Sequence, residues 1–108
     1  MDYSQLSDFE INKRVFKAIV GAKPLGYPHN ADGRSVGNES NGNYRWYDYC
    51  NNPADAWPII EKYRISIINL DEDEWGARGV AYCKSKRAIH ENPLRAAMIV
   101  FLMMQRIQ

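Results

Sequence analysis

The side chains of this 108-residue chain that are best suited to bind a metal ion belong to two cysteines and two histidines. Structural zinc sites hold such ligands in close pairs, commonly with about two to four residues between them. The nearest two here, Cys83 and His90, are seven positions apart, and Cys50 and His29 lie much further away. The spacing therefore predicts no metal site, and no other pattern in the sequence calls for a cofactor.

Covalent catalysis would require a nucleophile beside a base. Cys83 and His90 could form such a pair if a strand and the following loop brought them together, but no flanking signature supports this. Ser35, Ser40 and Ser85 lie in polar segments and lack the G-x-S-x-G pattern of a nucleophilic elbow. We therefore predict that the protein is not an enzyme.

The stretch NYRWYDY, residues 43–49, interleaves aromatic rings with a guanidinium group. In a strand, alternation places Arg45, Tyr47 and Tyr49 on one face. Single-stranded bases stack on such surfaces, and neighbouring cations attract phosphates. These three residues are therefore our candidate binding residues, for a protein partner or for a nucleic acid.

Basic residues near the end of a predicted hairpin could add contacts to phosphates. The formal net charge is only +1, however, whereas nucleic-acid-binding domains are commonly strongly basic. The competing interpretation is that Trp46 and one tyrosine face belong to the core, while residues 84–87 form a solvated loop. The basic candidates are Arg78, Lys84, Lys86 and Arg87.

Length and a hydrophobic content of 45% fit one domain with one core. The acidic start, MDYSQLSDFE, lacks the basic and apolar regions of a signal peptide, which favours a cytoplasm with reduced thiols. The longest apolar run, residues 96–104, is far shorter than the roughly 20 residues that span a bilayer. We expect a soluble intracellular protein.

The first helix has clear boundaries in the sequence. Ser7 and Glu10 form an S-x-x-E capping box, and Leu6 with Ile11 has the spacing of a hydrophobic staple. Gly21 is expected to end the helix, because glycine adopts the left-handed conformation at low cost. The apolar stripe of this helix would consist of Phe9, Val15, Phe16 and Ile19.

Residues 22–43 predict a long loop, because they are dense in Gly, Asn and Pro and have no apolar periodicity. Loops longer than about 12 to 15 residues are usually functional or mobile. The segment is either a tolerated insertion or part of a binding surface.

A second helix is expected over residues 56–63, with Asp55 as its N-cap and Pro58 in its first turn. Asn52 and Pro53 offer an earlier start. The residues of this helix that would face inward are Ile59 and Ile60.

Residues 64–70, RISIINL, predict a strand with Ile65 and Ile67 on one face. An acidic turn over 71–74 would lead to a partner strand over 75–82. Because an isolated hairpin is not stable, a third strand or a helix must lie against it.

The last segment, residues 92–108, predicts a helix with Asn92 as N-cap and Pro93 in its first position. Most of its circumference is apolar, whereas a surface helix needs an apolar stripe only a little over about 100° wide. Either the helix is central in its own domain, or its second face packs on a partner chain. We favour the partner, in a homodimer through this helix. The polar residues, clustered in about a third of the circle, are Arg95, Gln105 and Arg106.

Several motifs together resemble those of the NinX-type family of small lambdoid phage proteins of unknown function. They are MDYSQLSDFEINKRV at the start, YDYCNNPADAWPII and ISI in the middle, the pair Trp75 and Ala77, and NPLRAAM near the end. The resemblance covers nearly the whole chain except residues 22–43. It implies a compact α+β unit in the cytoplasm of an infected bacterium, with no catalytic residue to carry over and with recombination genes nearby. The recurrent positions are Tyr49, Pro58, Ile59, Ile60, Trp75, Pro93, Leu94 and Ala97.

The sequence therefore predicts a single α+β domain, residues 1–108, in which three helices pack on a small antiparallel sheet. We expect an accessory interaction module of a phage that recognises an unknown phage or host protein through the loop 22–43 and Arg45, Tyr47 and Tyr49. The alternative is a single-stranded nucleic-acid-binding protein that uses the same aromatic residues. In that case the phosphate contacts would come from Lys84, Lys86 and Arg87.

Overall fold

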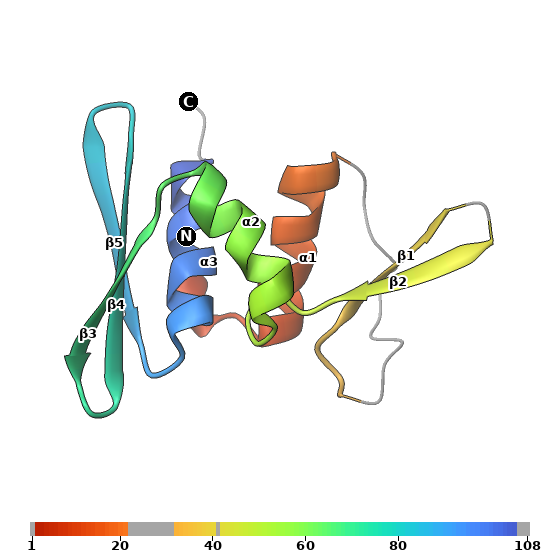
Figure 1. The fold of residues 1–108 in the computed structure, drawn as a ribbon, viewed down its shortest axis with the longest axis horizontal. Helices are drawn as coiled ribbons and strands as arrows, with labels where there is room; N and C mark the ends of the chain where they lie inside the picture. The colour runs from red at the N-terminus through yellow and green to blue at the C-terminus, as the bar shows by residue number, and fades with distance from the viewer. Residues whose placement is uncertain (1, 22–31, 41, 106–108) are drawn as a thin grey trace.

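The computed structural model describes residues 2–21, 32–40 and 42–105. Within them, three α-helices form a central group, with a three-stranded sheet at one end of the molecule and a two-stranded hairpin at the other (Figure 1). The predicted α+β class is confirmed, with two small antiparallel sheets in place of one. After a short 3-10 helix, Tyr3–Gln5, the elements are α1 (Asp8–Val20), β1 (Val36–Ser40), β2 (Asn43–Tyr47), α2 (Pro53–Lys62), β3 (Ser66–Asp71), β4 (Glu74–Ala81), β5 (Lys84–His90) and α3 (Pro93–Met104).

Helix α1 begins and ends where its sequence predicts. Ser7 Oγ accepts a hydrogen bond from the Glu10 amide at 3.1 Å, and Gly21 follows the helix with a φ of +83°. The Glu10 carboxylate pairs with Lys13 at 3.1 Å instead of completing the capping box. Ile19 is exposed, so the buried stripe is shorter than predicted. Its fully covered members are Ile11, Val15 and Phe16.

Helix α3 lies between the three-stranded sheet and the other two helices (Figure 1). Asn92 caps it, because its Oδ1 accepts hydrogen bonds from the amides of Leu94 and Arg95 at 2.9 and 3.2 Å. None of residues 93–105 is exposed. The same chain therefore covers the apolar circumference, and the central-helix explanation is confirmed. The reason for expecting a homodimer through this helix is removed.

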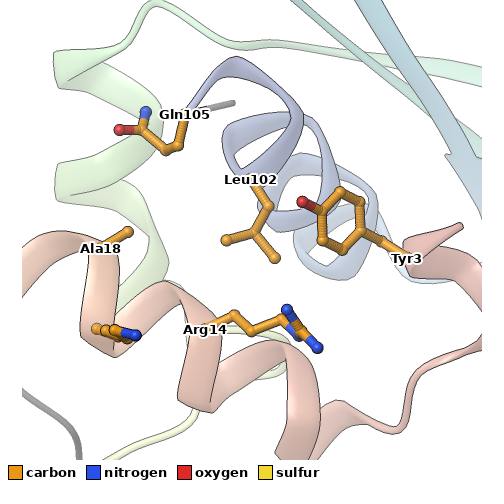
Figure 2. A pocket seen from close by; sticks show the side chains of 6 residues that line it. Tyr3, Arg14, Ala18, Leu102 and Gln105 are labelled. Atoms are coloured by element: carbon orange, nitrogen blue, oxygen red, sulfur yellow. The ribbon is translucent and has the colours of Figure 1, made fainter. Parts of the chain in front are cut away.

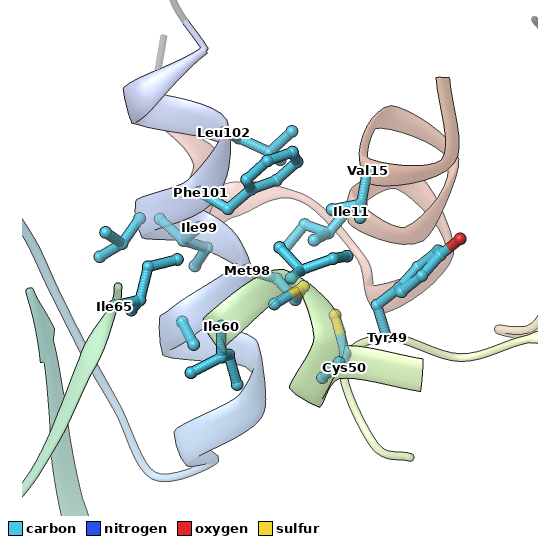
Figure 3. Packing of buried hydrophobic residues seen from close by; sticks show 14 of the residues in the cluster. Ile11, Val15, Tyr49, Cys50, Ile60, Ile65, Met98, Ile99, Phe101 and Leu102 are labelled. Atoms are coloured by element: carbon cyan, nitrogen blue, oxygen red, sulfur yellow. The ribbon is translucent and has the colours of Figure 1, made fainter. Parts of the chain in front are cut away.

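Side chains of α3 form the middle of the hydrophobic core (Figure 3). Phe101 is fully buried, and the ring of Tyr63 packs against it edge-on at a centroid distance of 4.9 Å. Ile11 and Val15 of α1 reach the same core from the opposite side. Among the described residues, no helix has the length and apolar character needed to cross a membrane.

The larger sheet has the order β3–β4–β5. The strands predicted over 64–70 and 75–82 are confirmed as β3 and β4, joined by the acidic turn. Residues 84–87, considered as a solvated loop, instead begin the third strand that the hairpin needed. Small residues on the inner face of β4 let α3 approach closely: a Cβ on Gly79 would lie 3.1 Å from Val100 Cγ1.

The smaller sheet corrects the predicted loop. Residues 36–40 pair with 43–47 as an antiparallel hairpin, and Gly42 in its turn has a φ of +80°. Val36 is fully buried, so burial at the hairpin base, together with the backbone pairing, offsets the low strand propensity of this segment. Residues 22–31 lie outside the described residues.

Helix α2 starts three residues earlier than the predicted position. Asn52 is its N-cap and accepts a hydrogen bond from the Ala54 amide at 3.0 Å. The Asp55 carboxylate accepts instead from the Asp48 amide at 2.9 Å, which ties the helix to the end of the hairpin. Pro58 therefore lies inside the helix rather than in its first turn. The two residues predicted to face inward, Ile59 and Ile60, are buried as expected.

Candidate functional site

A polar network joins the hairpin to the helices, with Asp48 at its centre. The Asp48 carboxylate accepts hydrogen bonds from Asn12 Nδ2 at 3.0 Å, Arg34 Nε at 2.6 Å and Asn51 Nδ2 at 3.0 Å. Asn12 is fully buried, and its Oδ1 accepts from the Cys50 amide at 3.1 Å. The hydrogen bond to Asp48 raises the pKa of Arg34. The network fixes the base of the hairpin against α1.

The network continues to the starts of α1 and α3. Arg95 Nη1 donates to Asp8 Oδ1 at 2.6 Å, and Nη2 donates to the carbonyl of Leu6, also at 2.6 Å. Asn92 Nδ2 donates to the Cys50 carbonyl at 2.8 Å. Arg95 was predicted on the polar side of its helix with Gln105 and Arg106, but it is buried and charge-paired. Sequence periodicity cannot show that the hydrogen-bond acceptors of a guanidinium group lie in a distant part of the chain.

Arg45, Tyr47 and Tyr49 share one face of the chain, as alternation predicts. The Tyr47 and Tyr49 rings stack at 5.6 Å with planes 5° apart, and the Arg45 guanidinium lies 5.3 Å from the Tyr47 centroid. This face turns toward α1, however: Phe16 contacts Tyr47 at 5.8 Å, and Tyr49 is only 4% exposed. Burial also raises the pKa of Tyr49 above its usual range. Tyr49 is therefore a core residue rather than a binding residue, and of these three residues only Arg45 is exposed.

The opposite face of the hairpin carries Trp46, which is 37% exposed. Its indole covers Gly37, where a Cβ would overlap the ring. Trp46 also lines a pocket of about 360 Å³ at the junction of the hairpin and the start of α2. The interpretation that placed Trp46 in the core is thus corrected. The face of the strand that is buried in the core is the one that carries Tyr47 and Tyr49. The other lining residues are Asp32, Arg34, Ser35, Asp48, Asn51, Asn52, Pro53 and Asp55.

A second exposed tryptophan lies on the adjoining helix. Trp57 on α2 is 56% exposed, and it follows Pro53 by one helical turn, so the two residues share a side of the helix. Since Pro53 and Trp46 line the same pocket, we call Trp46, Pro53 and Trp57 the tryptophan face. Sequence analysis missed it, because an apolar residue beside Ile59 and Ile60 in a helix is normally core.

Lys84, Lys86 and Arg87 lie on β5, at the end of the molecule opposite to Arg45 and the hairpin (Figure 1). The structure therefore does not bring the two halves of the candidate nucleic-acid site together. Another aromatic residue does lie near the basic strand: Tyr82, in the turn between β4 and β5, is 71% exposed.

The thiol and imidazole groups are dispersed. Cys83 precedes β5 and His90 ends it, so the strand holds them apart rather than together. Cys50 is buried, and that burial raises the pKa of its thiol, which leaves it protonated and unreactive. In the parts of the chain that the structure describes, His, Cys, Asp and Glu form no group that could hold a metal ion. His29 lies outside those parts.

A further pocket of about 330 Å³ lies between the start of the chain, α1 and the end of α3 (Figure 2). Leu102 and Ala18 give it an apolar wall, and its polar groups are those of Arg14, Lys17, Gln105 and the Tyr3 hydroxyl. These groups include no nucleophile beside a base, so the pocket does not suggest a reaction.

The fold and its surfaces define a class of small α+β protein whose buried polar residues hold elements together. The family described as "Bacteriophage P22, NinX" matches residues 2–105. The chain therefore belongs to the NinX family of phage proteins, as the sequence motifs suggested.

A solved structure supports the fold over nearly the whole chain. The "2.0 A Crystal Structure of a Phage Protein from Bacillus cereus ATCC 14579" superposes with a TM-score of 0.67 and 20% sequence identity. The alignment covers 96% of this chain and 97% of that one. At this identity the likeness concerns the fold alone. Among curated protein sequences, none is significantly similar to this chain.

Proposed function

We propose that this NinX-family protein is a non-enzymatic interaction module that binds a phage or host protein in the cytoplasm of the infected cell. The recognition surface is the tryptophan face, and Arg45 lies on the other face of β2, outside it. The observation that carries the proposal is the exposure of Trp57, more than half of whose surface is open to solvent. Exposed tryptophans are enriched among the residues that dominate protein–protein binding energies.

The surroundings of the two indoles support this role. Both lie on supports that are fixed by the polar network, since Asp48 holds the hairpin base and Asp55 joins it to α2. A rigid aromatic surface loses little conformational entropy on binding. The pocket beside Trp46 adds hydrogen-bonding groups at the rim, as in many interfaces.

The test is affinity capture from infected cells with the tagged protein, with Trp57→Ala and Trp46→Ala as variants. Tyr82→Ala is the matched control, because Tyr82 is also an exposed aromatic residue but lies on the larger sheet. We expect a partner that is retained by the wild type and the control and lost with both tryptophan variants. Identical partners for all four proteins would contradict the proposal.

The alternative function, single-stranded nucleic-acid binding, is favoured by a different observation from the one the sequence suggested. Tyr82 is exposed in the turn that leads into the basic strand β5, two residues before Lys84. An exposed ring beside cations can stack on a base while the cations contact phosphates. The stacking residue would then be Tyr82 instead of Tyr47 or Tyr49.

Titration with a single-stranded oligonucleotide at several salt concentrations tests this alternative. Arg87→Gln should reduce the slope of log K against log salt by about 0.7, the loss of one phosphate contact. Arg14→Gln, which removes the same charge from α1, should leave the slope unchanged. Absence of binding at low salt would remove the alternative.

A further inference from the structure

Helix α3 covers the inner face of the sheet β3–β4–β5, and no described element packs on the outer face (Figure 1). Ile68, Leu70 and Ile89 are all about half exposed there. They surround Gly76 and line a groove of about 520 Å³. The apolar centre of this face is thus open to solvent.

Charged residues flank this apolar centre in two separate rows. On β4, Glu74 lies two residues before Gly76 and Arg78 two residues after it, so all three belong to the outer face. On β5, Arg87 is directly opposite Arg78. One row is therefore doubly positive.

The other row is negative by the same geometry. Ile89 is directly opposite Gly76, and Glu91 comes two residues later, just beyond the end of β5. Glu91 is exposed, and it directly follows His90, which is opposite Trp75, the neighbour of Glu74. The outer face therefore reads, along the strands, as a glutamate row, an apolar row and an arginine row.

This order is unfavourable for an isolated chain. Like charges directly opposite one another in neighbouring strands are destabilising. Within the described residues, none of the four charged side chains forms an ion pair. Arg78 has one polar contact, a hydrogen bond from Nε to Ser85 Oγ at 3.0 Å. A partner surface with the opposite order of charged rows would neutralise both the arginine row and the glutamate row.

We propose that the occupant of this face is the same face of a second copy of the chain. The two copies would be related by a two-fold axis that runs parallel to the sheet, perpendicular to the strands, at the level of Gly76 and Ile89. Rotation about this axis places the arginine row of each copy over the glutamate row of the other. Apolar residues then meet their own counterparts, as an isologous interface requires. Two sheets that pack face to face keep their strand directions roughly aligned, and the sheets lie about 10 Å apart, a distance that these side chains can span.

The alternative two-fold axis, along the strands, would place arginine over arginine and is excluded by repulsion. The charge pattern therefore specifies one arrangement of the two copies. In that dimer the hairpins point away from each other, because each lies at the end of its molecule opposite to the sheet. Two tryptophan faces would be presented at once, although this interface does not depend on the proposed function.

Sedimentation equilibrium of the full chain, from micromolar to millimolar concentration, tests the proposal. We expect the wild type to dimerise with an affinity that falls as salt rises, since exposed charges are screened. Arg78→Glu places a carboxylate over Glu74 of the other copy and should weaken the dimer about tenfold or more, which is about 1.4 kcal/mol. Adding Glu74→Arg to that variant restores complementary rows and should restore association.

A mixing experiment gives an independent readout. The doubly acidic variant Arg78→Glu/Arg87→Glu and the doubly basic variant Glu74→Arg/Glu91→Arg should each remain monomeric and should form a heterodimer when combined. Glu61→Arg on the exposed side of α2 is the matched control and should dimerise like the wild type. Circular dichroism of each variant shows that it is folded.

Two outcomes would overturn the proposal. One is a wild type that stays monomeric over the whole concentration range. The other is a dimer whose affinity the paired charge exchanges do not change, since that dimer would use a different surface.

Discussion

Arg95 Nη1 donates a hydrogen bond to Asp8 Oδ1 at 2.6 Å, although the two residues are 87 positions apart. The pair joins the first turn of α3 to the first turn of α1. Arg95 is almost fully buried, whereas Asp8 keeps about a quarter of its side chain exposed. Because a buried guanidinium without its anion is costly, this contact fixes how the two ends of the chain meet.

Asp8→Asn should lower the free energy of unfolding by about 3 kcal/mol, the lower end of the range for breaking a buried ion pair. The lower end applies because Asp8 is partly exposed. Urea denaturation monitored by circular dichroism measures the change. Glu10→Gln, which breaks the exposed pair with Lys13, should cost less than about 1 kcal/mol. Equal costs for the two variants would show that Arg95 finds another partner.

Phe101→Ala should cost about 3 to 5 kcal/mol, because it removes a fully buried ring and the edge contact with Tyr63. Thermal melts of the two proteins give the difference. Ile19→Ala, on the exposed side of α1, is the control and should change stability by less than about 1 kcal/mol. A near-neutral result for Phe101→Ala would contradict the central place of α3 in the core.

Gly37→Ala should displace the Trp46 indole, because the added methyl group would occupy part of the space that the ring fills. The expected result is a shift in tryptophan fluorescence with the fold retained. Gly33→Ala is not a suitable control, since its φ of +72° would add backbone strain. The spectrum of Trp46→Phe identifies the contribution of this ring, and an unchanged spectrum of Gly37→Ala would show that the indole does not cover Gly37.

The two thiols should differ strongly in reactivity. Cys83 is exposed, whereas Cys50 is fully buried and its pKa is raised by that burial. One thiol per chain should therefore react with an aromatic disulfide reagent at neutral pH, and the second only in denaturant. Cys83→Ser should abolish the fast phase. Fast modification of Cys50 in the folded variant would contradict its burial.

Burial raises the pKa of Tyr49 above its ordinary value of 10.0, and this gives stability a defined pH dependence. Above pH 10 the unfolded chain loses this proton while the folded chain retains it, so unfolding becomes more favourable. The contribution is complete below that pH and is lost as pH rises further. Tyr49→Phe removes it, and its stability, measured by urea denaturation, should fall less steeply between pH 10 and 11 than that of the wild type.

The local boundaries were determined by the sequence alone. Ser7, Gly21 and Asn92 act on backbone groups within a few residues of themselves, so the ends of α1 and the start of α3 could be predicted. The acidic turn and the strand pair around it also followed from short-range patterns. Family motifs spread along the chain identified the NinX family for the same reason, since they are visible in linear order.

Only the tertiary structure decided which apolar and polar residues are covered. The sequence of α3 is equally compatible with burial against a partner chain and with burial against the sheet and helices of the same chain. Which of the two occurs depends on contacts between distant segments. The hairpin β1–β2 has weak local propensity and is held by Asp48, Asn12 and buried Val36. Tyr49, a predicted binding residue, is buried, and Trp57, for which the sequence predicted no role, is exposed, because burial depends on which distant segments pack against each side chain.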